Sequence, residues 1–210
     1  MKIRYLGHSC FEITGRNGVK LITDPYTKVG YELPQGLSAD VLTLSHAHFD
    51  HSFMQAVKSK VVLAEAKVYH LDGVEIVGVE SYHDPKKGAL RGKNIIYKIT
   101  IDGVTFCHMG DIGEACSKEL VEKIGKVDVL LIPVGGTYTV DAFGAKEYID
   151  KICPKAVIPM HYKPQDGALD IMGIQPFLDL YKDEPIQKIV GGVIQIDENT
   201  SGIIYMERVK

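Results

Sequence analysis

The sequence predicts an αββα sandwich, in which two mixed β-sheets pack face to face and α-helices cover the outer faces. Three observations favour this fold class. Short runs of β-branched and apolar residues fill the first half of the chain, segments with helical spacing lie mainly in the second half, and strand-like runs return near the end. The chain has 210 residues and no evident linker, repeat or low-complexity tract, so we expect one domain over residues 1–210. A single open α/β sheet with helices on both faces is the alternative fold.

Predicted strands dominate the first half of the chain. Two short segments, Gly15–Gly18 and Asp102-Gly103, are typical of the turns that close β-hairpins. The expected strands are Lys2–Leu6, Cys10–Thr14, Val19–Thr23, Val41–Leu44, Val61–Ala64, Val74–Val79, Ile95–Ile101 and Val104–Cys107.

Helices and strands alternate in the second half. Ser117 precedes the amphipathic segment Lys118–Ile124 and Gly125 follows it, which predicts a capped and terminated helix. The nearly continuous apolar run Val127–Ile132 is typical of a strand covered on both faces. The remaining expected elements are helices at Asp141–Ile152 and Ile174–Tyr181, and strands at Ala156–Ile158, Ile186–Val190, Val193–Ile196 and Gly202–Met206.

Composition limits the classes of function and location. The chain is 45% hydrophobic and 24% charged, with a net charge of −3. Domains that bind nucleic acid are usually strongly basic, so we expect no nucleic-acid partner. A secretory leader pattern and a membrane-spanning apolar run of roughly 20 residues are both missing, which predicts a cytoplasmic protein without a membrane partner. Wide spacing predicts free, buried thiols at Cys10, Cys107, Cys116 and Cys153.

A dense group of metal-binding side chains follows the predicted strand Val41–Leu44. His46, His48, Asp50 and His51 lie within six residues, and their imidazole and carboxylate groups suit zinc, manganese and iron. Strand alternation places His46 and His48 on one side, as two ligands for one ion. A turn after them would direct Asp50 and His51 toward a second ion. A polar surface cluster at a strand end is the alternative interpretation.

Three more candidate ligands occupy matching positions and weaken that alternative. His83, Asp111 and His161 each follow an apolar strand that runs into a loop containing Pro or Gly. Such loops commonly carry function, because the scaffold fixes them while their backbone stays accessible. With the first group they supply seven ligands, which is enough for two ions with positions left for water.

At these residues the chain resembles the metallo-β-lactamase superfamily, whose His-x-His-x-Asp-His signature matches His46–His51 without departure. It looks most like the small lactonase-like branch, which includes ascorbate-phosphate lactonases and other metal-dependent hydrolases. The resemblance covers nearly the whole chain and implies the αββα fold. The motifs that carry the closer match are Tyr5–Ser9, Ile22–Pro25, His108–Asp111, Pro133–Asp141 and Pro159–Tyr162.

The resemblance also implies a ligand set for two divalent ions, with zinc preferred and manganese or iron as alternatives. The first ion would be held by His46, His48 and His83. The second would be held by Asp50, His51 and His161, with Asp111 bridging the pair. Related oxygen- and nitric-oxide-reducing di-iron proteins carry Glu where His48 stands, so hydrolysis is expected here rather than redox chemistry.

The expected activity is hydrolysis of a small ester, lactone or phosphodiester by water that two metal ions activate. Asp50 is expected to be a ligand that doubles as proton acceptor for this water. A nuclease acting on RNA or DNA is one alternative, and a non-catalytic metal-binding regulatory or assembly protein is another. A homo-oligomer is compatible with the sequence.

The predicted substrate is anionic, because cationic side chains flank two of the candidate ligands. Lys86, Lys87 and Arg91 follow His83, and Lys163 follows His161. A solvated loop is the alternative explanation for these charges.

Other polar residues in the motifs have two interpretations each. Tyr138 and Asp141 are expected in the pocket wall, although Asp141 could instead cap the following helix. His8 could line the pocket or orient a ligand, or be a hydrogen-bonded histidine of a strand turn. Asp24 is expected to steady the ligand loops through hydrogen bonds, as its family counterpart does, and His108 is expected to be structural.

Overall fold

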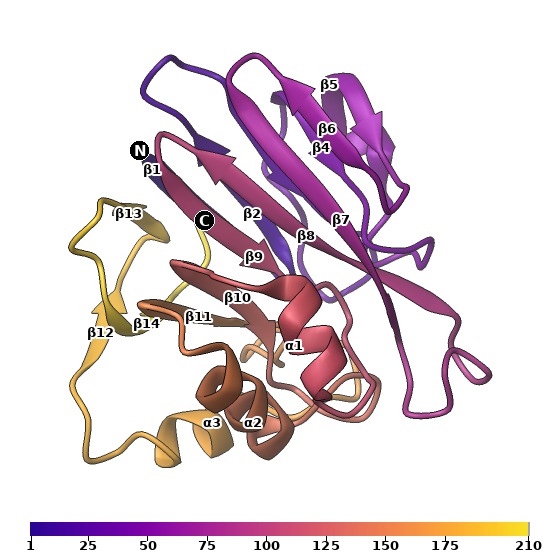
Figure 1. Ribbon diagram of the computed structural model, residues 1–210, viewed down its shortest axis with the longest axis vertical. Helices are drawn as coiled ribbons and strands as arrows, with labels where there is room; N and C mark the ends of the chain where they lie inside the picture. Colours follow the sequence, from indigo (N-terminus) through magenta and orange to yellow (C-terminus); the bar gives the residue numbers. More distant parts are fainter. Residues whose placement is uncertain (210) are drawn as a thin grey trace.

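The computed structural model describes residues 1–209 and contains two mixed β-sheets packed face to face (Figure 1). The six-stranded sheet has the order β13 (Val193–Gln195), β1 (Lys2–Gly7), β2 (Cys10–Thr14), β3 (Lys20–Thr23), β4 (Leu37–Thr43), β5 (Val57–Leu63). The eight-stranded sheet has the order β12 (Ile186–Ile189), β14 (Gly202–Met206), β11 (Ala156–Met160), β10 (Val129–Pro133), β9 (Val104–His108), β8 (Lys93–Ile101), β7 (Val74–Tyr82), β6 (Val68–Leu71). The observed arrangement of two facing mixed sheets therefore confirms the predicted one.

Three α-helices among the described residues lie together on the outer side of the eight-stranded sheet (Figure 1). They are α1 (Lys118–Ile124), α2 (Ala142–Ile152) and α3 (Gln175–Asp179). Helix α1 packs against β7 and α2 packs against β10. The Ser117 hydroxyl accepts a hydrogen bond from the Leu120 amide, and Gly125 ends the helix at a φ of 62°, so the predicted cap and stop are confirmed.

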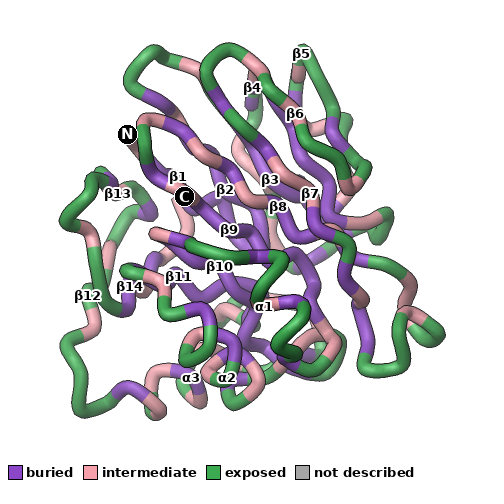
Figure 2. The backbone as a smooth tube through the Cα atoms, in the orientation of Figure 1, coloured by how far each residue is buried: buried purple, intermediate pink, exposed green. Residues whose placement is uncertain are grey.

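The inner strands β1, β2, β3 and β4 of the six-stranded sheet are largely buried on both faces, and alternation along them shows how (Figure 2). Tyr5 and Leu21 point into the core shared with the other sheet. Leu6 and Ile22, one position further along the same strands, belong to a second apolar cluster on the outer face.

That outer cluster is covered by an irregular segment, residues 24–36, rather than by an α-helix. Tyr26 and Val29 of this segment are buried against the sheet. The segment joins β3 to β4, which are parallel, so it must cross over the sheet. Pro25 and Pro34 disfavour helix in it, which explains why the crossover is a loop.

Several element boundaries differ from the prediction. Strands β4 and β5 begin four residues earlier than expected, and α3 is shorter than expected at both ends. Strand β6 was not predicted, although Asp72-Gly73 joins it to β7 with positive φ values of 48° and 83°, the same signal as Asp102-Gly103. Of the four cysteines, Cys153 is exposed and the other three are buried, so the expectation of burial is wrong for Cys153. Among residues 1–209, no helix combines the length and apolar character that crossing a membrane requires.

Hydrogen bonds join the two sheets near the ends of β4 and β5. The Tyr97 hydroxyl of β8 donates to the carbonyls of Leu63 at 3.0 Å and Leu44 at 3.3 Å, and the Ile95 amide donates to the Ser45 carbonyl at 2.9 Å. The loops that carry the candidate ligands start beside these contacts, so the contacts fix the position of one sheet edge relative to the other.

Replacing Tyr97 by Phe is expected to lower the free energy of unfolding by about 1–2 kcal/mol, because a buried hydroxyl that donates between the sheets is lost. Urea denaturation of wild type and variant measures this change. Tyr69→Phe is the matched control, since its hydroxyl makes an exposed hydrogen bond to Glu65. Equal stability losses in the two variants would contradict a special contribution from Tyr97.

Candidate metal centre

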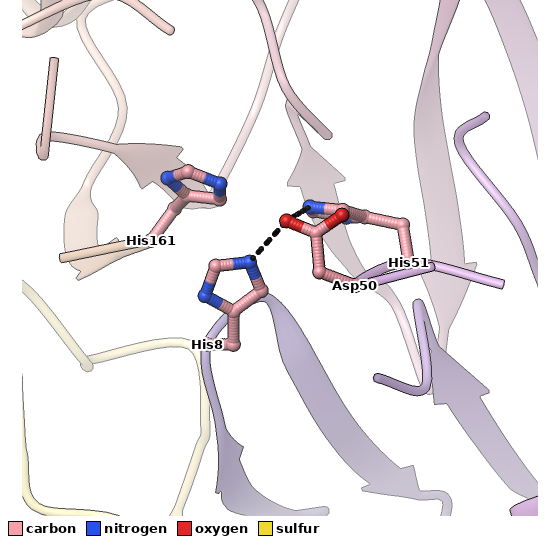
Figure 3. Close-up of side chains that lie close together, drawn as sticks. All are labelled: His8, Asp50, His51 and His161. Atoms are coloured by element: carbon pink, nitrogen blue, oxygen red, sulfur yellow. Dashed lines mark hydrogen bonds and ion pairs between the residues drawn. The ribbon is translucent and has the colours of Figure 1, made fainter. Parts of the chain in front are cut away.

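The predicted ligands come together at one edge of the sandwich. Strands β4, β7, β9 and β11 end there, and the loops that follow them carry the candidate side chains. One group contains His46, His48 and His83, and its ligand atoms lie within 4.8 Å of one another. A second group, shown in Figure 3, contains His8, Asp50, His51 and His161 and meets the same limit. These two groups resemble the predicted division of ligands, with His8 added to the second, while a third group of Asp24, His46 and His51 takes a residue from each predicted set, so the division stays a prediction.

Asp111 lies between the two groups. Its Oδ2 atom is 3.1 Å from Nε2 of His83 and 3.3 Å from Nε2 of His161. Its Oδ1 atom is 3.1 Å from Nε2 of His51. A carboxylate that reaches histidines of both groups is suited to bridge two ions, so the structure is compatible with the predicted role of Asp111.

The loop that presents Asp111 is held by a buried asparagine. The Asn94 carbonyl accepts a hydrogen bond from the Asp111 amide at 2.9 Å, while its amide group donates to the Met109 carbonyl at 3.0 Å. The preceding Gly110 has a φ of 55°, and a Cβ atom there would lie 2.3 Å from the Asn94 oxygen. A glycine is therefore required by both backbone conformation and space.

The donor atoms at this edge fit a divalent metal. Among the described residues, four buried atoms that face the centre make no hydrogen bond of normal geometry, although some lie within ion-pair distance of one another; they are His46 Nε2, His51 Nε2, His161 Nε2 and Asp111 Oδ1. Buried polar atoms in folded proteins normally form hydrogen bonds, so a group of nitrogen and oxygen atoms without them needs an explanation. Nitrogen and carboxylate oxygen donors in this arrangement match the ligands of zinc, manganese and iron.

The pKa shifts of the candidate ligands also support a site for a cation. Burial lowers the pKa of His46 to about 3, which keeps its imidazole neutral and able to ligate. Burial alone would raise the pKa of Asp111, but the neighbouring His161 and His51 outweigh it and hold that pKa well below its usual range. Burial opposes a charge on His51, yet Asp111 and Asp24 raise its pKa well above the usual value. The centre thus surrounds buried carboxylates with imidazoles and favours a cation.

Asp24 orients the candidate ligand His51 and the adjoining loop through hydrogen bonds. Its carboxylate accepts hydrogen bonds from the Ser45 amide at 2.8 Å and from Nδ1 of His51 at 2.8 Å. Because Nδ1 of His51 is occupied in this way, Nε2 is the nitrogen that faces Asp111. The carbonyl of Tyr138 plays the same part for Nδ1 of His83, at 3.1 Å. These contacts support the predicted steadying role of Asp24.

Positive φ values occur at three non-glycine residues of the centre. They are 53° at His8, 37° at Asp24 and 50° at His161. Such conformations are uncommon for residues with side chains and often mark functional sites, where surrounding contacts hold them in place.

His108 is buried beside the centre but does not belong to it. Its Nε2 atom lies 2.8 Å from the Ser9 carbonyl, and its Nδ1 atom accepts a hydrogen bond from the Gly110 amide. Both ring nitrogens therefore bind backbone groups, in agreement with the expected structural role.

A pocket of about 540 Å³ opens over the centre. Its nine lining residues are Ala47, His48, Phe49, Asp50, His83, Arg91, Asp111, Tyr138 and Leu169. A larger pocket of about 680 Å³ lies on the other side of His46, which is the one candidate ligand in its lining. Since the smaller pocket contains four candidate ligands, chemistry is expected there.

Of the seven predicted substrate-binding residues, two line the pocket and five do not. Arg91 and Tyr138 line the pocket, with the guanidinium 5.5 Å from the centre of the tyrosine ring. Five others do not line it, and contact between substrate and His8, Lys86, Lys87, Asp141 or Lys163 stays a prediction.

Three of these five have clear structural surroundings. The Asp141 carboxylate caps α2 by accepting a hydrogen bond from the Gly144 amide at 2.9 Å. Lys86 and Lys87 are exposed.

Three apolar pocket residues, Ala47, Phe49 and Leu169, were not predicted. Phe49, 48% exposed, stands between His48 and Asp50, where an apolar residue inside a polar motif was a usable signal. Leu169 carries no comparable local signal, because it reaches the pocket from the loop that follows β11.

Comparisons with known proteins agree with this geometry. Residues 2–161 match the family model described as "Beta-lactamase superfamily domain". A UPF0173 metal-dependent hydrolase of Pyrococcus furiosus is 32% identical over 192 residues, covering 77% of this chain and 84% of that protein. Another, from Thermococcus onnurineus, is 29% identical over 191 residues with the same coverage of 77% and 84%.

Two solved structures share the fold. A protein of Thermotoga maritima, described as a candidate Zn-dependent hydrolase of the metallo-β-lactamase superfamily, has a TM-score of 0.82 and 34% identity, covering 100% of this chain and 99% of its own. Igni18, a metallo hydrolase of Ignicoccus hospitalis, has a TM-score of 0.65 and 24% identity over 87% of this chain and 90% of its own, which indicates the fold alone.

Replacing Asp24 by Asn is expected to weaken metal binding by about 10–100-fold, because the residue that orients His51 loses its charge. Competition with a chromogenic chelator measures the affinity. Asp128→Asn is the matched control, since Asp128 binds the Thr105 amide and Lys155 away from the centre. Wild-type affinity in a folded Asp24→Asn variant would contradict the orienting role.

Proposed function

The chain belongs to the β-lactamase superfamily, and from that premise we propose that it is a metal-dependent hydrolase acting on a small anionic ester, lactone or phosphodiester. The observation that carries the proposal is the position of Asp111 between two groups of histidines at the base of a pocket. The hydrolase names of its relatives support the reaction class.

The proposed ligand set follows the two groups of donors. His46, His48 and His83 would hold one ion, Asp50, His51 and His161 the other, and Asp111 would bridge them. Bound divalent ions would lower the pKa of water and polarise the oxygen of the scissile group. Zinc is the preferred metal, with manganese and iron as alternatives, because nitrogen and oxygen donors serve all three.

Asp50 is proposed to serve as a ligand and as a proton acceptor. It lines the pocket and is 9% exposed, so a proton can reach it from a bound substrate or water. Burial alone would raise its pKa, but the hydrogen bond with His8 and the field of His51 lower it below the usual range. The carboxylate is therefore ionised at neutral pH, as a metal ligand must be, and the proposed proton transfer rests on its position in the pocket rather than on this lowered pKa.

Arg91 is proposed to bind the anionic part of the substrate. It is the one lysine or arginine among the nine residues that line the pocket, and no carboxylate within residues 1–209 forms an ion pair with it. A guanidinium beside a site that binds cations favours a ligand carrying its own negative charge. The apolar side chains of Phe49 and Leu169 would contact the remainder of the substrate.

The loop that carries Arg91 is held in place by hydrogen bonds to the buried Asp84. The buried Asp84 carboxylate accepts backbone hydrogen bonds from Lys86 at 2.8 Å, Leu90 at 3.0 Å and Arg91 at 2.8 Å. Gly88 adds a fourth, at 3.2 Å. The Arg91 backbone is thus fixed next to His83, which supports a specific role for its side chain.

From the sequence we further propose a single domain over residues 1–210, a cytoplasmic location and a small-molecule partner. A homo-oligomer is compatible with this proposal. A single lysine or arginine in the pocket lining gives no support to the nuclease alternative.

Metal analysis followed by a substrate panel tests the reaction class. The purified protein is expected to contain divalent metal, and esters, lactones and phosphodiesters are expected to include a substrate that it hydrolyses. Chelation should abolish turnover and readdition of metal should restore it, while Asp111→Asn should reduce turnover to background because both ions lose a ligand. Unchanged turnover after chelation or in Asp111→Asn would refute the proposal.

Replacing Arg91 by Gln is expected to raise the KM of anionic substrates about tenfold or more, because a charge-assisted hydrogen bond is lost. Neutral esters should change little. Steady-state kinetics on matched neutral and anionic esters measure the difference. Arg16→Gln, in the exposed turn between β2 and β3, is the control. Equal effects on neutral and anionic substrates would exclude anion recognition by Arg91.

A further inference from the structure

His8 lies beneath the proposed metal centre and points toward it. Its side chain is 1% exposed, and its Nε2 atom is 3.2 Å from Oδ2 of Asp50 (Figure 3). Its ring centre lies 4.2 Å from that of His161. The residue therefore contacts two proposed ligands of the second ion and has no access to the pocket.

The backbone of His8 is held from three directions. The His8 amide donates to the Tyr31 hydroxyl at 3.1 Å. The His8 carbonyl accepts from the Tyr5 hydroxyl at 3.0 Å and from the His161 amide at 2.9 Å. The last of these bonds ties the turn between β1 and β2 to the loop after β11.

The turn itself is costly to form. His8 has a φ of 53° and Gly7 a φ of 114°, and a Cβ atom on Gly7 would lie 2.8 Å from the Tyr26 hydroxyl. Such a conformation is retained where surrounding contacts enforce it. Its effect here is to direct an imidazole at Asp50.

A comparison with His108 separates this arrangement from ordinary burial of a histidine. His108 is also fully buried, but both of its ring nitrogens bind backbone groups. The partner of His8 is instead a side chain proposed to ligate metal. A carboxylate can only accept, so His8 donates its Nε2 proton to Asp50.

We propose that His8 is a positioning residue of the metal centre, which fixes the Asp50 carboxylate through the Nε2–H···Oδ2 hydrogen bond. The inference rests on the metal centre of the proposed function. Hydrogen-bond partners of metal ligands orient them, and their removal typically weakens metal binding by about 10–100-fold. The effect of His8 is therefore exerted on the second ion through Asp50.

A matched pair of variants tests this. His8→Asn tolerates a positive φ but is too short to place a donor beside Asp50, whereas His8→Gln can place its amide N–H where the imidazole Nε2–H lies. Zinc binding to the metal-free protein is measured by chelator competition, together with the rise in Tm that zinc causes. His70→Asn is the control, because His70 is exposed on β6.

His8→Asn is expected to bind the more weakly held zinc equivalent about 10–100-fold less tightly and to show a smaller zinc-induced rise in Tm. His8→Gln is expected to recover part of both. With a hydrolysed substrate in hand, kcat should fall more than KM rises, since Asp50 is displaced while Arg91 is not. Unchanged zinc affinity in His8→Asn, or a lower metal-free Tm with an unchanged zinc-induced rise, would overturn the inference.

A measurement on the wild-type protein covers the case in which His8→Asn does not fold. The nitrogen chemical shifts of the His8 ring in the zinc-loaded protein are expected to report a protonated Nε2. An Nε2 without its proton, bonded directly to zinc, would overturn the positioning role. A wild-type protein that binds no divalent metal would overturn the proposed function and the inference with it.

Discussion

The structure of this edge depends on the burial of three carboxylates, Asp24, Asp50 and Asp111, in a space filled mainly by imidazoles. Removing carboxylates from water is unfavourable unless charge or hydrogen bonds compensate. Within the described chain no lysine or arginine forms an ion pair with any of the three, so compensation comes from histidines. The Nε2 atoms of His46, His51 and His161 make no hydrogen bond of normal geometry, and a divalent ion would satisfy them together with the negative charge.

The fold delivers these groups by bringing strand ends from both sheets to the same edge. Ligand residues from the six-stranded sheet follow β4, with the positioning residue His8 after β1, and ligand residues from the eight-stranded sheet follow β7, β9 and β11. The backbone bond from the His161 amide to the His8 carbonyl and the bond from the Ile95 amide to the Ser45 carbonyl cross between the sheets there. A shift of one sheet against the other would therefore change both groups of donors at once, so packing of the core and geometry of the centre are coupled.

Much of this could be predicted from local sequence, because strand alternation, turn residues and helix caps act over a few residues. The hairpin at Asp102-Gly103, the capped helix α1 and the donors at strand ends are of this kind. The cover of the six-stranded sheet by Tyr26 and Val29 was missed, since it depends on where a crossover loop returns in space. The same holds for Leu169, and for the four backbone bonds by which Asp84 fixes the loop of Arg91.

The arrangement also links metal occupancy to stability. Buried imidazole and carboxylate atoms without a hydrogen bond raise the free energy of the metal-free fold, and so do the positive φ values at His8, Asp24 and His161. A metal that binds the folded chain and not the unfolded one stabilises it in proportion to the logarithm of its concentration over its dissociation constant. The remainder of the molecule, with its two apolar clusters and inter-sheet bonds, must hold the donors in place before any ion arrives. The extensive backbone support behind His8, Asp84 and Asp111 follows from that requirement: a preformed centre needs rigid loops, and rigid loops at a sheet edge need buried polar partners.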